Sequence, residues 1–339
     1  MENKERQVES KNLTINDIAM ELGVSKTTVS RAISGKGRIS EKTRIRVQEY
    51  IEAHNYRPNI IAKSLAQSKT FNIGVVLPTD TNLVEVPFFQ SCLMGICEAA
   101  VGFEYDVVVI TTTEDDMSQL RRVVQKNKVD GIILTRITTN DLATDYLKKS
   151  HIPFIVIGSS EDSEVVQIDN NHMEGCAELT SILIKYGYKR MALLGGNQRH
   201  IVNNNRYRGF IKGFEDNQMK ANESLVYMNL ISKVMIDRTV DLVMNEDIDC
   251  IVCTDDNICS QVLTRLNEKG YSIPENIKIA SFYDSVFLAN YNPPVTSLRI
   301  DVKALGIEAG KCLIHLIKQQ EVAPRKLLGY ELVLKKSTI

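Results

Sequence analysis

The chain has 339 residues, of which 43% are hydrophobic and 24% charged, and its formal net charge is −1. The first ten residues are polar, and no apolar run approaches the roughly 18 residues of a membrane span. We therefore expect a soluble, cytoplasmic protein with no export signal and no membrane partner. Seven cysteines, an odd number, fit a reducing compartment.

The charge is segregated along the chain. Between Lys11 and Thr70, eleven Lys and Arg residues stand against five Asp and Glu residues, whereas the rest of the chain carries a net negative charge. A basic segment is attracted to the phosphates of nucleic acid, and an acidic segment is repelled by them. The two parts of the chain are therefore expected to have different partners.

Two short helices joined by a tight turn are predicted near the N-terminus. Apolar residues recur at helical spacing at Ile15, Ile18, Ala19 and Leu22. This spacing favours a helix with one buried face. Thr14 occupies an N-cap position, and Asp17, three residues later, completes a variant of the capping box. Gly23 suits the turn, and Ser25 offers the N-cap of a second helix over residues 26–33.

This arrangement is typical of a helix-turn-helix motif. Ala19 allows the helices to approach, Gly23 makes the turn and Val29 fills the space between the helices. A third helix, capped by Ser40, is predicted from Glu41 to about His54. Its candidates for closing a small core are Ile45, Val47 and Ile51. A three-helix bundle that binds no nucleic acid would show a similar pattern, but the positive charge of this segment argues against it.

The second helix of such a motif enters the major groove with its N-terminal residues against base edges. Lys and Arg donate to guanine, and a Thr methyl group can contact the methyl group of thymine. The predicted base-reading residues are Lys26, Thr27 and Arg31. The predicted phosphate contacts, which set the register of the helix on DNA, are Thr14, Ser25, Thr28 and Ser30. For Thr28 and Ser30, the alternative is that they only solvate the helix.

A short helical segment is predicted after Pro58, continuing to Ala66. It covers about two turns, so it should be unfolded alone and fold on DNA. Together with the head, this segment closely resembles the LacI/GalR family of bacterial transcriptional regulators. The resemblance implies a hinge helix that pairs with its dimer mate in the minor groove, where Leu65 wedges open a base step and Ala62 packs beside it. The alternative for Leu65 is an ordinary core residue of a linker helix.

The remainder of the chain alternates short apolar runs with helical stretches. The runs cover residues 73–78, 106–110, 131–134 and 153–158, and then 190–196, 250–253 and 277–282. Unbroken β-branched runs between helices indicate parallel strands that are buried on both faces. Two such sets predict an α/β body of two doubly wound parallel-sheet subdomains with a cleft between them, joined to the small all-α head.

The family resemblance extends over this body. It rests on four segments, residues 86–89, 168–175, 206–210 and 294–298. The resemblance implies a periplasmic-binding-protein-like fold that closes on a small effector and thereby moves the hinge helices. The expected regions are a disordered tail (1–12), the head (13–57), the hinge (58–70) and the body (71–339). Within the body, the expected N-subdomain is about 71–170 with 299–328, and the C-subdomain about 171–298 with 329–339.

Several residues of the body are candidates for the effector site. Arg206 matches the family arginine that reaches into the cleft, where a guanidinium group can hold vicinal hydroxyls or a carboxylate. The alternative for Arg206 is a salt bridge. Asp169 aligns with a cleft carboxylate, and its alternative is an N-cap. Thr254, followed by Asp255, stands where many members of the family have an amide.

Tyr283 marks a second departure from the family. It aligns with the aspartate that usually grips sugar hydroxyls, although a shift of one residue would bring Asp284 into that place. The sequence leaves both possibilities open. With Tyr283 in place, the site loses a charged acceptor and gains an aromatic face, which suits a plain polyol less well.

The sequence predicts a DNA-binding transcriptional regulator, most simply a repressor. It would bind a near-palindromic operator as a homodimer, and a small effector such as a sugar would control its affinity. The alternatives are control by a protein partner and, with less support, a solute-binding protein. No nucleophile and base are assembled, so no enzyme, cofactor or metal site is expected. Cys250 and Cys253 point to opposite faces of a strand, which indicates core residues.

Overall fold

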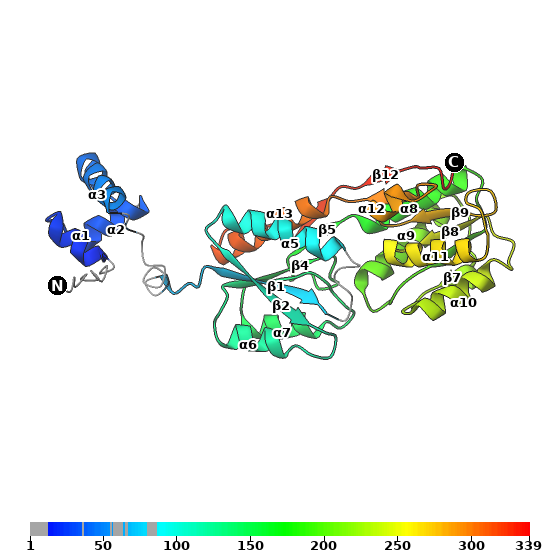
Figure 1. Cartoon of the computed structure of the whole chain (residues 1–339). Coiled ribbons are helices and arrows are strands. Elements are labelled where there is room, and N and C mark those ends of the chain that lie inside the picture. Colours follow the sequence, from blue (N-terminus) through cyan, green and yellow to red (C-terminus); the bar gives the residue numbers. More distant parts are fainter. Residues whose placement is uncertain (1–12, 36, 55, 57–63, 65–66, 80–86) are drawn as a thin grey trace, which may run out of the picture. The chain divides into compact units, whose positions relative to one another are not determined.

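The computed structural model describes residues 13–35, 37–54, 56, 64, 67–79 and 87–339 (Figure 1). The chain divides into two compact units, Met1–Lys69 and Thr70–Ile339. The predicted hinge residues Ala62 and Leu65 lie outside the described residues.

The described part of the first unit contains the helices α1 (Ile15–Glu21), α2 (Lys26–Ser34) and α3 (Glu41–Ala53). Each helix begins at a side-chain cap. Thr14 and Asp17 form a reciprocal capping box at α1, and Ser25 and Ser40 cap α2 and α3. Gly23 has a φ of +62°, the left-handed conformation that the tight turn requires.

The core of the first unit forms where the three helices meet. Ile18, Val29 and Val47 are almost completely buried there. Ile45, expected in this core, is instead 50% exposed, so that expectation was wrong. Two residues along a helix turn its face by about 200°, so a helix that buries Val47 presents Ile45 to solvent.

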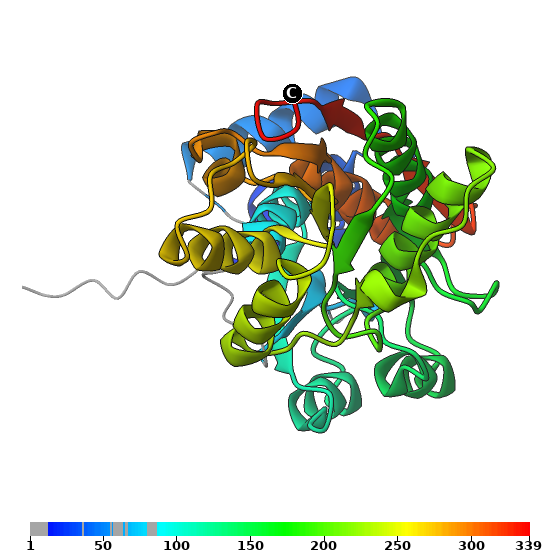
Figure 2. The ribbon, with the colours of Figure 1, turned by 90° about the vertical axis from the view of Figure 1, so that its right-hand side faces the viewer.

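The second unit contains two six-stranded sheets (Figures 1 and 2). The first, in the order β11-β5-β4-β3-β1-β2, comprises β1 (Asn72–Pro78), β2 (Asp106–Thr112), β3 (Gly131–Leu134), β4 (Phe154–Ile157), β5 (Gln167–Asn170) and β11 (Arg325–Leu328). The second, in the order β12-β10-β9-β8-β6-β7, comprises β6 (Met191–Leu194), β7 (Val226–Tyr227), β8 (Cys250–Cys253), β9 (Lys278–Ser281), β10 (Thr296–Arg299) and β12 (Glu331–Val333). Among the described strand pairs, β10 with β12 is antiparallel and the others are parallel. The predicted fold class is confirmed.

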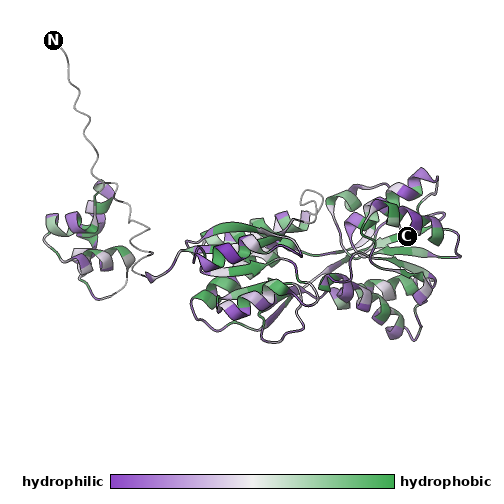
Figure 3. Cartoon of the chain, turned by 90° about the horizontal axis from the view of Figure 1, so that it is seen from below, coloured by the Kyte–Doolittle hydropathy of each residue, from purple (hydrophilic) through white to green (hydrophobic). Residues whose placement is uncertain are grey.

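Helices cover both faces of each sheet, and the strands between them are mostly hydrophobic (Figure 3). On the first sheet, α5 (Pro87–Val101) and α13 (Val302–Ile317) pack on one face, and α6 (Ser118–Gln125) and α7 (Leu142–Ser150) on the other. On the second sheet, α8 (His172–Lys185) and α9 (Ile201–Asp216) lie opposite α10 (Lys233–Val243) and α11 (Asp256–Glu268). A short η1 (Glu223–Leu225) and α12 (Val286–Asn290) complete the second subdomain.

Buried glycines and cysteines belong to this packing. A side chain at Gly95 of α5 or Gly306 of α13 would collide with the backbone of the facing helix, so these glycines allow the two helices to touch. Cys250 packs in the core under α8 and α9, whereas Cys253 packs in the core under α10 and α11. The two thiols therefore face opposite sides of β8, as a strand requires.

The chain crosses between the two sheets at three places. These are the connections from β5 to α8, from β10 to α13 and from β11 to β12. The crossing strands lie at one edge of each sheet. They are β11 and β5 in the first sheet, and β12 and β10 in the second. The strand ends at the far edges can therefore separate or approach while the crossovers stay joined.

Candidate nucleic-acid interface and ligand cleft

The start of α2 presents an exposed polar surface. Lys26, Thr27, Ser30 and Arg31 are exposed, and Thr28 is partly buried. Residues at this spacing share one side of a helix, so their donor groups face solvent together. The positive end of the helix dipole adds to the two cationic side chains. The surface is suited to contacts with base edges and phosphates.

The other predicted phosphate contacts also cap helices. The Thr14 hydroxyl donates to Asp17 over 2.6 Å. Ser25 Oγ accepts from the Thr28 backbone N–H over 3.1 Å and lies 2.9 Å from Thr28 Oγ1. A phosphate contact by these hydroxyls would therefore add to an existing capping bond.

Gly37 is a residue that the sequence argument did not single out. It has a φ of +90°, and a Cβ atom there would lie 2.9 Å from Cδ of Arg31. The absence of a side chain at Gly37 thus leaves room for the Arg31 side chain beside α2. The glycine itself, a residue that tolerates a positive φ, was the sequence signal that could have indicated this role.

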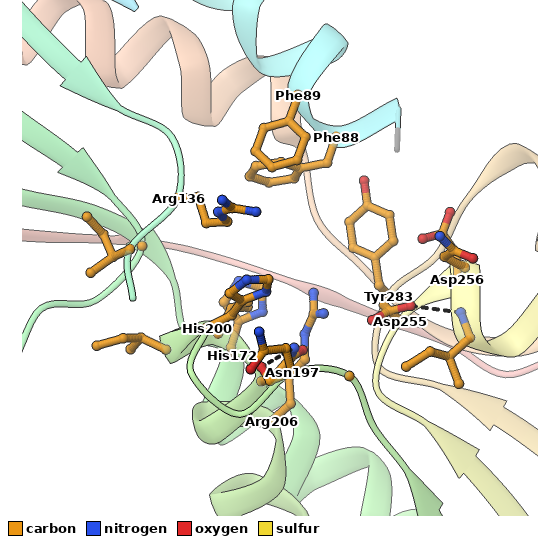
Figure 4. Close-up of a pocket in the computed structure, with 18 of the residues that line it drawn as sticks. Phe88, Phe89, Arg136, His172, Asn197, His200, Arg206, Asp255, Asp256 and Tyr283 are labelled. Carbon is orange, nitrogen blue, oxygen red and sulfur yellow. Dashed lines mark hydrogen bonds between the residues drawn. The ribbon is translucent and has the colours of Figure 1, made fainter. Parts of the chain in front are cut away.

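A cavity of about 700 Å³ lies between the two subdomains of the body (Figure 4). Its walls come mainly from loops and helix starts beyond the carboxyl ends of the parallel strands, the usual place for ligands in such sheets. Of the predicted effector residues, Arg206, Asp169, Asp255 and Tyr283 line the cavity. Thr254 is completely buried behind the wall, where its hydroxyl accepts from the backbone N–H of Gly196 over 3.3 Å.

Arg206 extends from α9 into the cavity wall and is 7% exposed. Its Cζ atom lies 5.8 Å from the centre of the Tyr283 ring. Within the described residues, its Nε atom has no hydrogen-bond partner. A buried donor without an acceptor is unfavourable, so this atom is suited to an acceptor supplied by a ligand. The alternative salt bridge of Arg206 is not formed within the described part of the chain.

Asp169, at the end of β5, is 3% exposed. It accepts hydrogen bonds from the Ser159 hydroxyl over 2.6 Å and from the Asn170 backbone N–H over 2.8 Å. The N-cap residue of α8 is Asn171, so Asp169 does not cap this helix. Burial raises the pKa of Asp169 to about 6 and lowers the pKa of the neighbouring His172 to about 3. The imidazole is therefore neutral near pH 7, and its Nδ1 atom has no partner within the described residues.

Two adjacent acids stand at the start of α11. Asp255 caps the helix by accepting from the Ile258 backbone N–H over 2.9 Å. Asp256 was not a predicted site residue, yet it lines the same cavity. Burial raises the pKa of Asp256 to about 6, and the nearby charge of Asp255 adds to the shift. The cavity thus contains two carboxyl groups, Asp169 and Asp256, that are poised to titrate close to neutrality.

Tyr283 and Asp284 point to different surroundings. Tyr283 lines the cavity, and its ring centre lies 6.4 Å from that of Phe88. Asp284 does not line this cavity. Its carboxylate accepts from the side chains of Ser297 at 2.8 Å, Lys335 at 2.9 Å and Arg299 at 3.0 Å. Of the two residues that the sequence left open, Tyr283 therefore faces the cleft and Asp284 does not.

Further cavity residues were not predicted individually, although Phe88 and His172 lie within the segments 86–89 and 168–175 that carry the family resemblance. They are Phe88 at the start of α5, Arg136 after β3, His172 in α8, and Asn197 and His200 before α9 (Figure 4). These residues lie far apart in the sequence, so no single local motif groups them. The end of a buried strand run was the one signal available for Arg136 and Asn197.

A second contact joins the two subdomains at the edge far from the crossovers. The Thr139 backbone N–H donates to Arg199 O over 2.8 Å, and the Ile201 N–H donates to Ile137 O over 3.1 Å. Beside this bridge, Glu114 accepts from Arg199 over 2.7 Å and lies 3.4 Å from Nε2 of His200. We call these segments, 114, 137–139 and 197–201, the clasp. Crossovers and clasp together hold the cavity between them.

Replacing Glu114 by alanine is expected to loosen the clasp. Glu114 is 18% exposed but Arg199 is 62% exposed, so solvent weakens their ion pair and the loss should be about 1 kcal/mol of unfolding free energy. Urea unfolding of the purified chain measures this value. The neighbouring Asp115→Ala, an exposed position, serves as the charge-matched control. An equal loss in both variants would show that the clasp does not stabilise the body.

The described residues contain neither a membrane-spanning helix nor a metal-binding cluster. No helix there is long and apolar enough to cross a membrane. No group of three or more His, Cys, Asp or Glu side chains in the described ranges is arranged to hold a metal ion.

Comparisons with known proteins place both units. Residues 14–59 match the model of bacterial regulatory proteins of the lacI family, and residues 180–338 match the periplasmic binding protein-like domain. The transcriptional regulator MalR of Staphylococcus xylosus is 29% identical over 317 residues, covering 91% of this chain and 93% of MalR. The lac repressor dimer bound to operator and the anti-inducer ONPF shares the fold, with a TM-score of 0.78 at 23% identity, over 97% of this chain and 100% of that chain. The CelR–cellobiose complex gives a TM-score of 0.73 at 23% identity, over 96% and 99% of the two chains.

A helix-turn-helix head with an exposed cationic helix, joined to a two-subdomain body around a ligand-sized cavity, defines a DNA-binding regulator. Its head matches the domain of lacI-family bacterial regulatory proteins, its body matches a periplasmic binding protein-like domain, and a curated relative that aligns over 91% of the chain is an HTH-type transcriptional regulator. The chain is a DNA-binding transcriptional regulator, which confirms the class predicted from the sequence.

Proposed function

We propose that this regulator is a repressor that binds a near-palindromic operator as a homodimer, and that a saccharide in the cavity controls its affinity for DNA. Two heads related by a two-fold axis read two half-sites, which is how such motifs reach useful affinity. Lys26, Thr27 and Arg31 read bases, and Thr14, Ser25, Thr28 and Ser30 hold phosphates. The hinge residues Ala62 and Leu65 enter the minor groove. The proposed regions are those expected from the sequence: the tail at 1–12, the head at 13–57, the hinge at 58–70 and the body at 71–339.

The chemistry of the cavity supports a neutral polyhydroxy ligand. The observation that carries this proposal is the buried Arg206, whose Nε has no described partner, in a cavity that also contains the carboxyl groups of Asp169 and Asp256. Hydroxyl groups both donate and accept, so one ligand can satisfy the guanidinium and the carboxylates together. The cavity lining contains four acids, Glu114, Asp169, Asp255 and Asp256, beside three cations, Arg136, Arg206 and Lys233, so its charges nearly balance and a neutral ligand suits it.

The apolar part of the wall supports a saccharide over a simple polyol. Phe88 and Tyr283 present rings, and Leu230 and Ile231 add aliphatic surface. A pyranose ring has an apolar face and a hydroxyl-bearing edge, and this combination matches such a wall. Binding sites of this volume usually pair an apolar lining with a few placed polar groups. The CelR–cellobiose complex is a structural relative with a bound disaccharide.

We further propose that the chain has no catalytic role and acts in the cytoplasm, since its relatives are transcriptional regulators. Control by a protein partner is the second candidate. Its support is the replacement of the family acid by Tyr283 in the cavity wall. In that case the cavity would contribute little to regulation.

A thermal-shift screen of the purified chain tests ligand control. The panel contains monosaccharides, maltose, cellobiose, sucrose, nucleosides and small carboxylates. A ligand at one hundred times its dissociation constant should stabilise the body by about 2.7 kcal/mol. A saccharide hit that also changes operator binding supports the proposal. A nucleoside or carboxylate hit would replace the ligand class, and no hit would favour control by a protein partner.

Ligand affinity is expected to fall as the pH is lowered from 7 to 5. The pKa values of Asp169 and Asp256 are raised to about 6, chiefly by burial, so acid protonates the groups that accept from ligand hydroxyls. The same shifts act on ligand-free stability in the opposite direction. The folded chain binds these protons more tightly than the unfolded chain, so the contribution of the two groups to stability is lost as pH rises through 6.

Titration of the saccharide hit at several pH values, beside urea unfolding of the ligand-free chain, measures both trends. Asp169→Asn removes one of the titrating groups and should flatten part of the affinity profile. Affinity that stays constant between pH 5 and 7 would contradict contact between the ligand and these carboxylates.

A further inference from the structure

The body begins at a tightly bonded junction between Thr70 and Asn72. Asp130, the residue before β3, receives three hydrogen bonds there: from the Thr70 backbone N–H at 2.7 Å, from the Thr70 hydroxyl at 2.8 Å and from the Phe71 N–H at 3.0 Å. The Asp130 N–H in turn donates to Asn72 O over 2.8 Å. One carboxylate thus binds the first residues of the body from the neighbouring strand.

The backbone of this junction is held in an uncommon conformation. Phe71 has a φ of +55°, which residues with a side chain rarely adopt. Such a conformation persists only where surrounding contacts determine it. Besides Asp130, these contacts include a bond from the Asp106 N–H to Phe71 O at 2.8 Å and the Tyr105 ring, whose centre lies 5.7 Å from that of Phe71. Without the carboxylate, the two donated N–H groups would lose their acceptor and the junction could relax.

The hydrogen bonds of Asp130 connect the start of the body to the central strands of the first sheet. β1 runs from the junction to Pro78, and Asp130 introduces β3, the parallel neighbour of β1. The junction therefore lies at the amino ends of these strands, and the cavity lies beyond the carboxyl ends. The junction and one wall of the cavity are attached to the same sheet. A rotation of this subdomain should therefore move the first residue of the body as part of the same rigid body.

We propose that Asp130 is a positioning residue that fixes the direction in which the chain leaves the body, and thereby transmits the conformation of the body to the DNA-binding segment. This inference rests on the proposed binding of a two-half-site operator. Coupling between distant sites requires a physical connection with defined arrangements. A rigid junction supplies it, whereas a relaxed junction would act as a flexible linker.

The spacing between half-sites offers a direct test. A duplex is first selected by the wild-type chain from a randomised pool, and affinities are then measured for that duplex, for versions with one or two base pairs inserted between the half-sites, and for a scrambled duplex. Because half-site spacing is set by geometry, the wild-type chain should lose about tenfold or more in affinity on insertion. Asp130→Ala should bind the selected duplex about tenfold more weakly and lose less than about threefold on insertion.

Two further variants separate positioning from folding. Asp106→Ala removes an exposed acid at the start of the adjacent strand and should keep the wild-type spacing profile. Thr70→Val removes the hydroxyl that donates to Asp130 and should shift the profile in the same direction as Asp130→Ala, by a smaller factor. The thermal unfolding midpoint of each variant reports whether the body is folded.

The outcomes are distinct. If the wild-type chain selects no duplex, the proposed operator binding fails. If it selects one and folded Asp130→Ala and Thr70→Val keep the wild-type spacing profile, the positioning role of Asp130 is overturned while operator binding stands. If Asp130→Ala does not fold, the spacing profile of Thr70→Val alone tests the positioning role: a wild-type profile overturns it, and a flattened profile supports it.

Discussion

Arg206→Ala is expected to abolish the response of operator binding to the effector and to leave operator affinity without effector unchanged. The guanidinium group is buried in the cavity wall and its Nε has no acceptor in the described residues, so its hydrogen-bonding capacity is available to a ligand. A bond between a charged donor and a ligand acceptor contributes about 1.5–3 kcal/mol, and a bidentate contact contributes more. Loss of both bonds should reduce effector affinity by roughly 100-fold or more.

Isothermal titration with the saccharide hit measures this loss, and fluorescence anisotropy with the selected duplex measures operator affinity. Arg208→Ala is the matched control, because Arg208 lies on the same helix with a side chain that is 60% exposed. Arg206→Lys keeps the charge but loses the planar fork, so it should recover only part of the affinity. A normal response by Arg206→Ala would place the effector site elsewhere.

Arg31→Ala is expected to weaken binding to the selected duplex about 10- to 100-fold and binding to a scrambled duplex much less. A bidentate contact from arginine to guanine discriminates by about 1–3 kcal/mol. Arg31 is exposed on the same side of α2 as Lys26 and Thr27, and Gly37 leaves room for it. The first residues of such a helix are the ones that face base edges.

Anisotropy measurements at several salt concentrations separate base contacts from phosphate contacts. Arg38→Ala, which removes one exposed charge outside α2, is the charge-matched control and should leave the ratio of the two affinities unchanged. Equal losses on the two duplexes for Arg31→Ala would make Arg31 a phosphate contact. The ratio of the two affinities is therefore the value that decides its role.

The head was predicted in detail because its signals are local. Caps, a turn glycine and helical spacing lie within a few residues of one another, and the structure contains the predicted caps at Thr14, Ser25 and Ser40. Ile45 was the exception, since its placement depends on which side of α3 meets the other two helices. Periodicity shows that a helix has a buried side, but a short helix with apolar residues on two sides leaves the choice to tertiary packing.

The cavity was predicted only in part. Arg206, Asp169, Asp255 and Tyr283 follow buried strand runs or family motifs, and all four line the cavity. Thr254 also follows such a run, but its side chain turns into the core. A residue that ends a strand can face either side, and one sequence does not fix which.

The clasp and the junction had no sequence signal. Glu114 and Arg199 are 85 positions apart and meet only when the subdomains adopt the arrangement in the structure. Asp130 and Thr70 meet because β1 and β3 are neighbours in the sheet, a pairing that the order of the strand runs does not reveal. Contacts of this kind depend on topology, which is why the structure was needed to identify them.

The most direct test of ligand-controlled repression is the affinity of the full-length chain for its selected duplex, measured with and without a saturating concentration of the saccharide hit. The account predicts a change of roughly 5- to 150-fold, the range of typical allosteric coupling. It also predicts that Arg206→Ala shows no change under the same conditions. Unchanged operator affinity of the wild-type chain, with saccharide binding demonstrated in the same sample, would contradict control through the cavity.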